Sequence, residues 1–318
     1  MKRKAPKRPL IISLGGNALI QRNERGTIEE QFRNAQKAAK AAIELITPST
    51  PVIITHGNGP IVGNLLIRSE AAKQEVPEDP LYMCDADSEG AVGFILQQAL
   101  HNALGKAGYK RQAAAIVTQV VVDKNDRAFK NPTKPVGPYY SKKEAALLTK
   151  TRKYVMKEDS GRGYRRVVAS PRPIRVIEAD IIKRLSLTGT IVIAAGGGGV
   201  PVVEGKDKTL RGIDAVIDKD LATVCLAKEL GSQTLIILTA IENAYVNFTT
   251  PSRKALGKIT ASEAKRYLKA GEFAPGSMGP KIEAAIEFIE NGGKKVIITT
   301  PEKAALALKG RAGTIITP

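Results

Sequence analysis

LIISLGGNAL, from Leu10 to Leu19, is the first apolar stretch of the chain and its strongest local indication of fold. Branched apolar residues run directly into two glycines and an asparagine, which is typical of a buried parallel strand that ends at a ligand-binding turn. Glycine lacks Cβ and tolerates positive φ, so backbone N–H groups in this turn can approach an anion, and the Asn17 amide can also donate. Taken alone, the pattern is more often a plain tight turn.

The same succession of strand and glycine turn occurs twice more. Val52–Thr55 runs into His56-Gly57-Asn58-Gly59-Pro60, and Thr190–Ala195 runs into the four glycines Gly196–Gly199. Four consecutive glycines are costly in conformational entropy, which favours a functional reason for them. Ligands of open parallel sheets bind beyond the carboxyl ends of the strands, so we expect the three turns to converge on one cleft. Their combined N–H donors would suit an oxyanion or a phosphoryl group in transfer.

Helices and strands are predicted to alternate through the rest of the chain. Thr27 and Glu30 form a capping-box pattern that opens a helix to about Ile46, and Thr260 and Glu263 open another. Helical patterns also cover 87–104, 214–227 and a last helix from residue 280, and further strands are expected at 113–122, 234–239, 296–300 and 314–317. This alternation predicts an α/β fold with a largely parallel sheet that is covered on both faces.

The composition excludes several classes of protein. Aromatic residues make up only 4% of the 318 residues, with no Trp, which argues against binding single-stranded nucleic acid by base stacking. Two cysteines and two histidines are too few for a disulfide framework or a Cys- or His-rich metal site, so a metal would be held by carboxylates or arrive with its ligand. No apolar stretch is long enough to cross a bilayer or to serve as a signal peptide, and we expect a cytoplasmic protein without membrane contact.

Positive charge is concentrated in two segments. The formal net charge is +18, and residues 1–9 form a basic arm that contains Lys2, Arg3, Lys4, Lys7 and Arg8. Residues 142–175 hold eleven Lys or Arg against three acidic residues. They follow the proline-rich segment 131–138, which excludes a helix or a central strand, so about 123–175 is predicted as a loop or projecting subdomain. Such charge fits a solvated face, a roof over an anion site or nucleic-acid binding.

Isolated lysines are the candidates for binding phosphate, because the chain has neither a P-loop nor a dinucleotide fingerprint. Lys219 lies between Asp218 and Asp220 in an otherwise apolar run, where two carboxylates can hold its ammonium in place. Lys281 occupies the first turn of a predicted helix, where the macrodipole disfavours a cation unless an anion is near. Lys134, on the proline-rich segment, is the third candidate.

Six motifs in order resemble the carbamate kinases of the amino-acid kinase family, and the resemblance extends from Leu10 to the C-terminus. In sequence order they are Leu14–Leu19 (LGGNAL), Thr55–Pro60 (THGNGP), Asn131–Pro138 (NPTKPVGP), Ile193–Pro201 (IAAGGGGVP), Ala215–Ala222 (AVIDKDLA) and Gly276–Lys281 (GSMGPK). The resemblance implies a three-layer α/β/α sandwich. It also implies reversible phosphoryl transfer between ATP and carbamate with Mg²⁺, often in the direction that makes ATP from carbamoyl phosphate, by a homodimer.

The resemblance further implies how the chain is divided. Residues 10–212 would form an N-terminal lobe for carbamate or carbamoyl phosphate, with the projecting subdomain at about 123–175 covering the acceptor. Residues 213–318 would form the nucleotide-binding lobe. Lys134 would contact the acceptor, Lys219 and Lys281 would stabilise the transferring phosphoryl group, and Asp220 would orient the lysines.

Two further sets of residues follow from the matching motifs. The substrate-binding set comes from the two N-terminal turns and consists of Gly15, Gly16, Asn17, Gly57, Asn58 and Gly59. The nucleotide-binding set consists of Gly197, Gly198, Thr239, Ala240, Ser277, Met278 and Lys281. No protein residue is assigned as a metal ligand.

Three departures from the family pattern lie in the N-terminal lobe. Ile61 and Glu89 stand where the family usually has glutamine, and Asp87 replaces an apolar residue. They leave open a second hypothesis, in which the same fold phosphorylates another small carboxylate, such as aspartate or an acylated amino acid. A third hypothesis, a basic nucleic-acid-binding protein, ranks last because the kinase motifs are specific and the charge is not.

Overall fold

The computed structural model describes almost the whole chain. The described residues are 8–16, 19–21, 24–58, 60–159, 161–248, 250–274 and 276–318. The strands are β1 (Leu10–Leu14), β2 (Val52–His56), β3 (Ala113–Ala115), β4 (Gln119–Val122), β5 (Lys134–Tyr140), β6 (Met156–Glu158), β7 (Tyr164–Val168), β8 (Pro173–Val176), β9 (Ile191–Ile193), β10 (Val200–Glu204), β11 (Leu210–Gly212), β12 (Thr234–Leu238), β13 (Tyr245–Val246), β14 (Lys254–Ala255), β15 (Lys258–Thr260), β16 (Lys295–Thr299) and β17 (Thr314–Thr317). The helices are α1 (Ile28–Glu44), α2 (Ile61–Ala72), α3 (Leu81–Lys106), α4 (Lys142–Arg152), α5 (Ala179–Leu187), α6 (Lys219–Leu230), α7 (Ala261–Lys269), α8 (Met278–Glu290) and α9 (Ala304–Leu308), with 3-10 turns η2 (Arg127–Phe129), η3 (Gly196–Gly198) and η4 (Pro301–Lys303).

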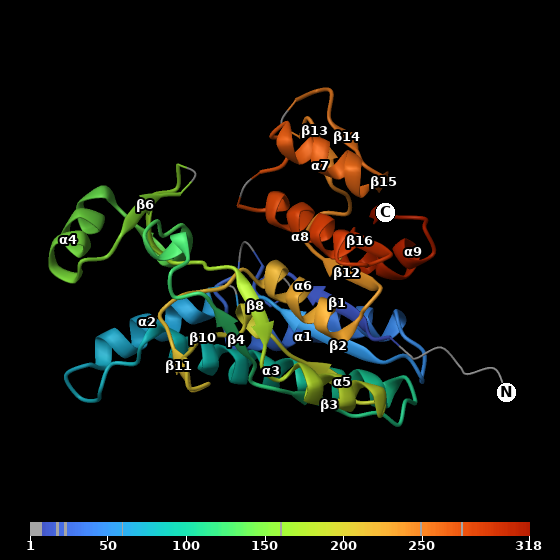
Figure 1. The fold of residues 1–318 in the computed structure, drawn as a ribbon, viewed down its shortest axis with the longest axis horizontal. Helices are drawn as coiled ribbons and strands as arrows, with labels where there is room; N and C mark the ends of the chain where they lie inside the picture. The colour runs from blue at the N-terminus through green and yellow to red at the C-terminus, as the bar shows by residue number, and fades with distance from the viewer. Residues whose placement is uncertain are drawn as a thin grey trace.

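A central sheet of eight described strands runs through the molecule in the order β15-β17-β16-β12-β1-β2-β9-β3 (Figure 1). Its strands pair in parallel except at β16 and β17, which are antiparallel. Alternate residues of β1 enter different cores, because Ile11 packs with the side chains of α6 and α8 and Ile12 packs with those of α1 and α3. The prediction of a three-layer α/β/α sandwich is therefore confirmed.

The described strands form three smaller sheets, of which one is the two-stranded β13-β14. The sheet β11-β10-β4-β8 lies beside the carboxyl end of β9, and the sheet β5-β7-β6 carries α4 away from the body, at the left of Figure 1. The latter sheet and helix span Lys134–Val168, inside the range predicted to project. Strand β5 tolerates its prolines because it is an edge strand that pairs only with β7.

Local signals located several boundaries well. Thr27 and Thr260 both form the predicted capping boxes, with Glu30 and Glu263, and they open α1 and α7. The single strand predicted at 113–122 is wrong, because Ile116–Thr118 separates β3 in the central sheet from β4 in a second sheet.

Among the described residues, no helix is both long enough and apolar enough to cross a membrane.

Two predicted helices begin at other residues than expected. The helix predicted over 87–104 begins earlier, at Leu81 after Pro80. The helix predicted from 214 begins only at Lys219, with Asp218 as its cap. The helices α2, α4, α5 and α9 were not predicted, and the five residues of α9 give too little periodicity to detect.

Candidate active site

The glycine turns after β1, β2 and β9 meet at one end of the central sheet. The Gly57 N–H donates to the Leu14 carbonyl at 3.0 Å, and a Cβ on Gly57 would lie 3.0 Å from the Gly16 nitrogen. The third turn joins them, because a Cβ on Gly197 would lie 2.5 Å from Asn58 Nδ2. Asn17 and Gly59, which were predicted to bind substrate, lie outside the described residues. The spatial convergence expected from the sequence therefore holds for the described parts of all three turns.

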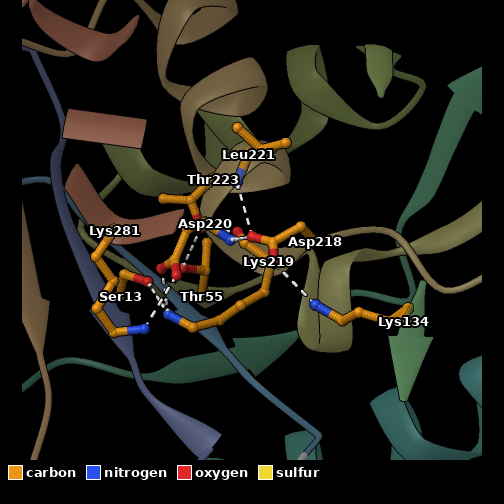
Figure 2. A network of polar contacts seen from close by, with 9 residues as sticks. All are labelled: Ser13, Thr55, Lys134, Asp218, Lys219, Asp220, Leu221, Thr223 and Lys281. Atoms are coloured by element: carbon orange, nitrogen blue, oxygen red, sulfur yellow. Dashed lines mark hydrogen bonds and ion pairs between the residues drawn. The ribbon is translucent and has the colours of Figure 1, made fainter. Parts of the chain in front are cut away.

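Asp220 bridges two lysines from different helices at this end of the sheet. Its Oδ1 accepts from Lys219 Nζ at 2.8 Å and its Oδ2 from Lys281 Nζ at 3.1 Å (Figure 2). Lys219 Nζ also donates to Ser13 Oγ on β1 at 2.7 Å, which fixes the ammonium beside the first glycine turn. Two cations therefore sit side by side on one carboxylate, directly where the turns converge.

Burial controls the charges of this trio. Only 4% of the Asp220 side chain, 11% of Lys219 and 14% of Lys281 are exposed. Burial opposes ionisation of Asp220, but the adjacent ammonium groups of Lys219 and Lys281 prevail and lower the pKa of the carboxyl below its usual range. Burial lowers the pKa of the Lys219 ammonium, and the Asp220 carboxylate counteracts this effect. Asp220 is thus the shared partner of both lysines, and it opposes the effect of burial on the Lys219 ammonium.

The third lysine reaches the same place from the projecting subdomain. Lys134 Nζ, at the start of β5, donates to Asp218 Oδ2 at 2.8 Å (Figure 2). The cluster then contains three ammonium groups and two carboxylates, which leaves one net positive charge. A partly buried site with this excess attracts an anion.

A cavity opens beside the trio on the side of β12 and α8. Its lining includes Gly15, Gly16, Thr239, Ala240, Ser277 and Lys281, among the residues predicted to bind substrate or nucleotide. It also includes Gln21, Asn34 and Lys37, which sequence reasoning missed.

Three residues of the predicted nucleotide set lie elsewhere. Met278 is 7% exposed and packs into the core. Gly197 faces Asn58, and Gly198 faces the Ile217 carbonyl, where a Cβ would lie 2.3 Å from the oxygen. These two glycines allow close packing between the second turn and the segment that precedes α6.

The hydroxyls that fix α6 were also missed by sequence reasoning. Thr55 Oγ1 on β2 lies 2.8 Å from Thr223 Oγ1, and Thr223 Oγ1 donates to the Lys219 carbonyl at 2.7 Å (Figure 2). With Ser13, these hydroxyls connect β1, β2 and the first turn of α6. The only signal for Ser13 and Thr55 in the sequence is a hydroxyl residue in a buried apolar strand, and Thr223 is a single hydroxyl residue in a helix, so the sequence does not single them out.

Buried polar groups of α3 lie beside the second and third glycine turns. Glu89 Oε2 accepts the Thr118 N–H at 2.6 Å, while Oε1 has no hydrogen-bond partner among the described residues. Burial raises the pKa of Glu89 well above its ordinary value, which favours a neutral carboxyl group there. Asn58 Nδ2, in the second turn, donates at 3.3 Å to Oγ of Ser88, which lies on α3 beside Glu89.

His56, at the end of β2, is buried, and burial lowers its pKa to about 4, so its imidazole is neutral.

Comparisons with known proteins agree with this geometry. The model of the amino acid kinase family matches residues 8–300. Carbamate kinase from Pyrococcus horikoshii is 48% identical over 97% of this chain and 99% of its own length, and that from Thermococcus kodakarensis is 47% identical over 96% and 98%. The structure of carbamate kinase from Giardia lamblia bound to AMP-PNP superposes with a TM-score of 0.90, at 42% identity over 98% of each chain. The chain therefore belongs to the amino acid kinase family and, within it, to the carbamate kinases.

Proposed function

We propose that this enzyme catalyses reversible phosphoryl transfer between ATP and carbamate, and that it can form ATP from ADP and carbamoyl phosphate. The observation that carries the proposal is the pair of buried ammonium groups on Asp220, beside three glycine turns. A phosphoryl group in transfer spreads negative charge over its oxygens, so catalysis consists largely of positioning and electrostatic stabilisation. Fixed cations in a site that excludes water supply this stabilisation without reorganising.

Each lysine has a separate role in this proposal. Lys219 and Lys281 contact the transferring phosphoryl group, and Asp220 holds both ammonium groups in place. Lys134 contacts carbamate or carbamoyl phosphate from the projecting subdomain. Carbamate is already an anion and attacks through its own oxygen, so no general base is required. The neutral state of His56 is compatible with this role assignment.

The nucleotide would occupy the cavity beside β12 and α8. The lining residues Thr239, Ala240 and Ser277 support this position, and the AMP-PNP bound to the solved relative supports the use of a nucleotide. Residues 213–318 would then be the nucleotide-binding lobe and 10–212 the acceptor lobe.

Mg²⁺ would enter with the nucleotide. Among the described residues, no three His, Cys, Asp or Glu side chains are grouped to hold a metal ion, and both Asp220 oxygens are engaged by lysines. This donor set suits an ion held mainly by phosphate oxygens and water, as Mg²⁺ usually is. When bound, Mg²⁺ neutralises part of the phosphate charge.

Two copies of the chain would associate through the edge of the central sheet at β3. Beside this edge strand, a groove is lined by Phe94 of α3 and Leu185 of α5, and Phe94 is 57% exposed. The groove also contains polar side chains, among them Gln97 and Gln112, and an exposed Phe beside an edge strand favours pairing with a second copy. Sedimentation equilibrium should give a dimer for the wild type and a monomer for Phe94→Glu, while Phe248→Glu, at an exposed Phe elsewhere, should stay dimeric. A monomeric wild type or a dimeric Phe94→Glu would contradict this interface.

A cytoplasmic location completes the proposal. Both cysteines are free, and Cys84 is buried. This usage is typical of proteins in a reducing compartment.

The decisive test of the reaction is an acceptor screen with purified protein. ATP formation would be followed with ADP, Mg²⁺ and carbamoyl phosphate, and ADP release with ATP and carbamate, aspartate or an acylated amino acid. We expect turnover with the carbamoyl compounds and none with the others. Turnover with only another carboxylate would favour the alternative acceptor that Ile61 and Glu89 leave open.

A further inference from the structure

Asp218 serves two separate groups with its two carboxylate oxygens. Oδ1 caps α6 by accepting the N–H of Asp220 at 2.9 Å and that of Leu221 at 3.4 Å (Figure 2). Oδ2 faces the other way and accepts from Lys134 Nζ at 2.8 Å. The capping function needs one oxygen only, so the second oxygen is available for another purpose.

The backbone on both sides of this pair is fixed. The Val216 N–H donates to the Ala169 carbonyl at 2.9 Å, and the Thr133 N–H donates to the Val168 carbonyl at 3.2 Å. The segment before α6 therefore lies against the base of the projecting subdomain, where β5 begins. This arrangement places the Asp218 carboxylate within reach of Lys134 while its neighbour in sequence, Lys219, faces Asp220.

Lys134 depends on Asp218 for its position. Its side chain is 30% exposed, and a flexible four-carbon stem carries the ammonium. Asp218 Oδ2 is the one hydrogen-bond acceptor that the ammonium contacts within the described parts of the chain. Without that acceptor, the ammonium would be free to turn into solvent.

We propose that Asp218 is a positioning residue for phosphoryl transfer, which holds the Lys134 ammonium beside the Lys219–Asp220–Lys281 network so that an incoming acceptor meets three fixed cations. The inference rests on the proposed function, in which Lys134 contacts the acceptor. The carboxylate form required for this role is favoured, because the ammonium of Lys134 lowers the pKa of Asp218 despite burial. By contrast, the ion pair between Lys134 and Asp218 adds little to the free energy of unfolding, since both side chains are partly exposed.

Asp218→Asn separates the two roles. Asparagine caps helices as well as aspartate does, so α6 keeps its cap, but its amide NH₂ in place of Oδ2 cannot accept from an ammonium. Asp126→Asn is the matched control for turnover, because Asp126 also caps with one oxygen and accepts a backbone N–H from Arg172 with the other, and it contacts no lysine of the site among the described residues. Thermal unfolding of Asp218→Asn should match that of the wild type, whereas Asp126→Asn loses the acceptor of the Arg172 N–H and should unfold at a slightly lower temperature with turnover unchanged.

The test is a double-mutant cycle of Asp218→Asn and Lys134→Ala, with kcat and KM measured for carbamoyl phosphate and for ADP. We expect Asp218→Asn to raise KM for carbamoyl phosphate about tenfold, within the range for residues of one ion-pair network, and to leave KM for ADP unchanged. In the Lys134→Ala background, the same substitution should change KM less than about twofold.

Each outcome has a defined meaning. Equal effects of Asp218→Asn in both backgrounds, or an unchanged KM in the wild-type background, would overturn the positioning role. A wild-type enzyme that turns over a different acceptor but not carbamoyl phosphate would contradict the proposed reaction instead. The same cycle measured with that acceptor would then decide the role of Asp218.

Discussion

Replacing Asp220 by asparagine tests how much of the site depends on one carboxylate. The substitution keeps the shape of the side chain and removes the charge that two lysines share at 2.8 and 3.1 Å. An ion pair with about 4 Å between charge centres is worth about 4 kcal/mol at an effective dielectric constant of about 20, and desolvation offsets much of this value.

The loss of stability expected for Asp220→Asn follows from what happens when one partner of a buried ion pair is removed. Removal of one partner leaves an uncompensated buried charge and typically costs about 3–5 kcal/mol. Here two ammonium groups would remain, with only 11% and 14% of their side chains exposed. We therefore expect the free energy of unfolding to fall by about 3 kcal/mol, and the midpoint of thermal unfolding by about 5 °C or more. Turnover should fall by about 100-fold or more, as when a fixed donor to an oxyanion is lost.

An exposed pair of the same length provides the control. Lys265 and Glu290 also approach to 2.8 Å, but about half of each side chain is exposed (52% and 54%). Glu290→Gln should change the free energy of unfolding by less than about 1 kcal/mol and leave turnover intact. Denaturant unfolding and coupled ATP formation would be measured for both variants. Equal losses of stability in the two variants, or normal turnover in Asp220→Asn, would refute the reasoning.

Two more substitutions test the turns. Gly198→Ala should lower the free energy of unfolding by about 2–3 kcal/mol in denaturant unfolding, because the residue has a φ of +112° and its Cβ would meet the Ile217 carbonyl. Gly231 also has a positive φ but has open space around it, so Gly231→Ala should lower the free energy of unfolding by about 1 kcal/mol. Equal losses in the two variants would contradict the packing argument. The pKa of His56 is about 4 in the folded protein, below its ordinary value of 6.5, because burial disfavours the charged imidazole. The contribution of His56 to the free energy of unfolding is therefore fully present above pH 6.5. It falls by about 3 kcal/mol in total as the pH is lowered to 4. The difference between wild type and His56→Gln in free energy of unfolding should therefore shrink over this range, and a constant difference would show that the imidazole is not held neutral.

Short-range patterns in the sequence were sufficient for the framework of the fold. The capping boxes at Thr27 and Thr260 are contained within four residues each, and the apolar strands that run into glycine turns depend only on neighbours in sequence. Because parallel strands end at a common edge, these local patterns also predicted that separate turns would meet.

Long-range contacts were beyond such patterns. The apolar run before Asp218 continues the helical period, yet it is not helical, and its Val216 N–H bonds to the carbonyl of Ala169, which follows β7. Lys134 lies 84 residues from Asp218, and Lys219 lies 206 residues from Ser13. The sequence identified the lysines, but the partners that hold them are set by the tertiary fold.

The most direct test of the account is the rate of phosphoryl transfer within a single turnover, from carbamoyl phosphate to bound ADP, in wild type and Lys281→Ala. If the fixed charge acts mainly on the transferring group, Lys281→Ala should transfer the phosphoryl group roughly 100-fold more slowly, which corresponds to about 3 kcal/mol in the activation free energy. Its affinity for ADP should change only slightly. An unchanged transfer rate, with the whole loss appearing as weaker binding of ADP, would contradict the claim that this ammonium stabilises the phosphoryl group in transfer.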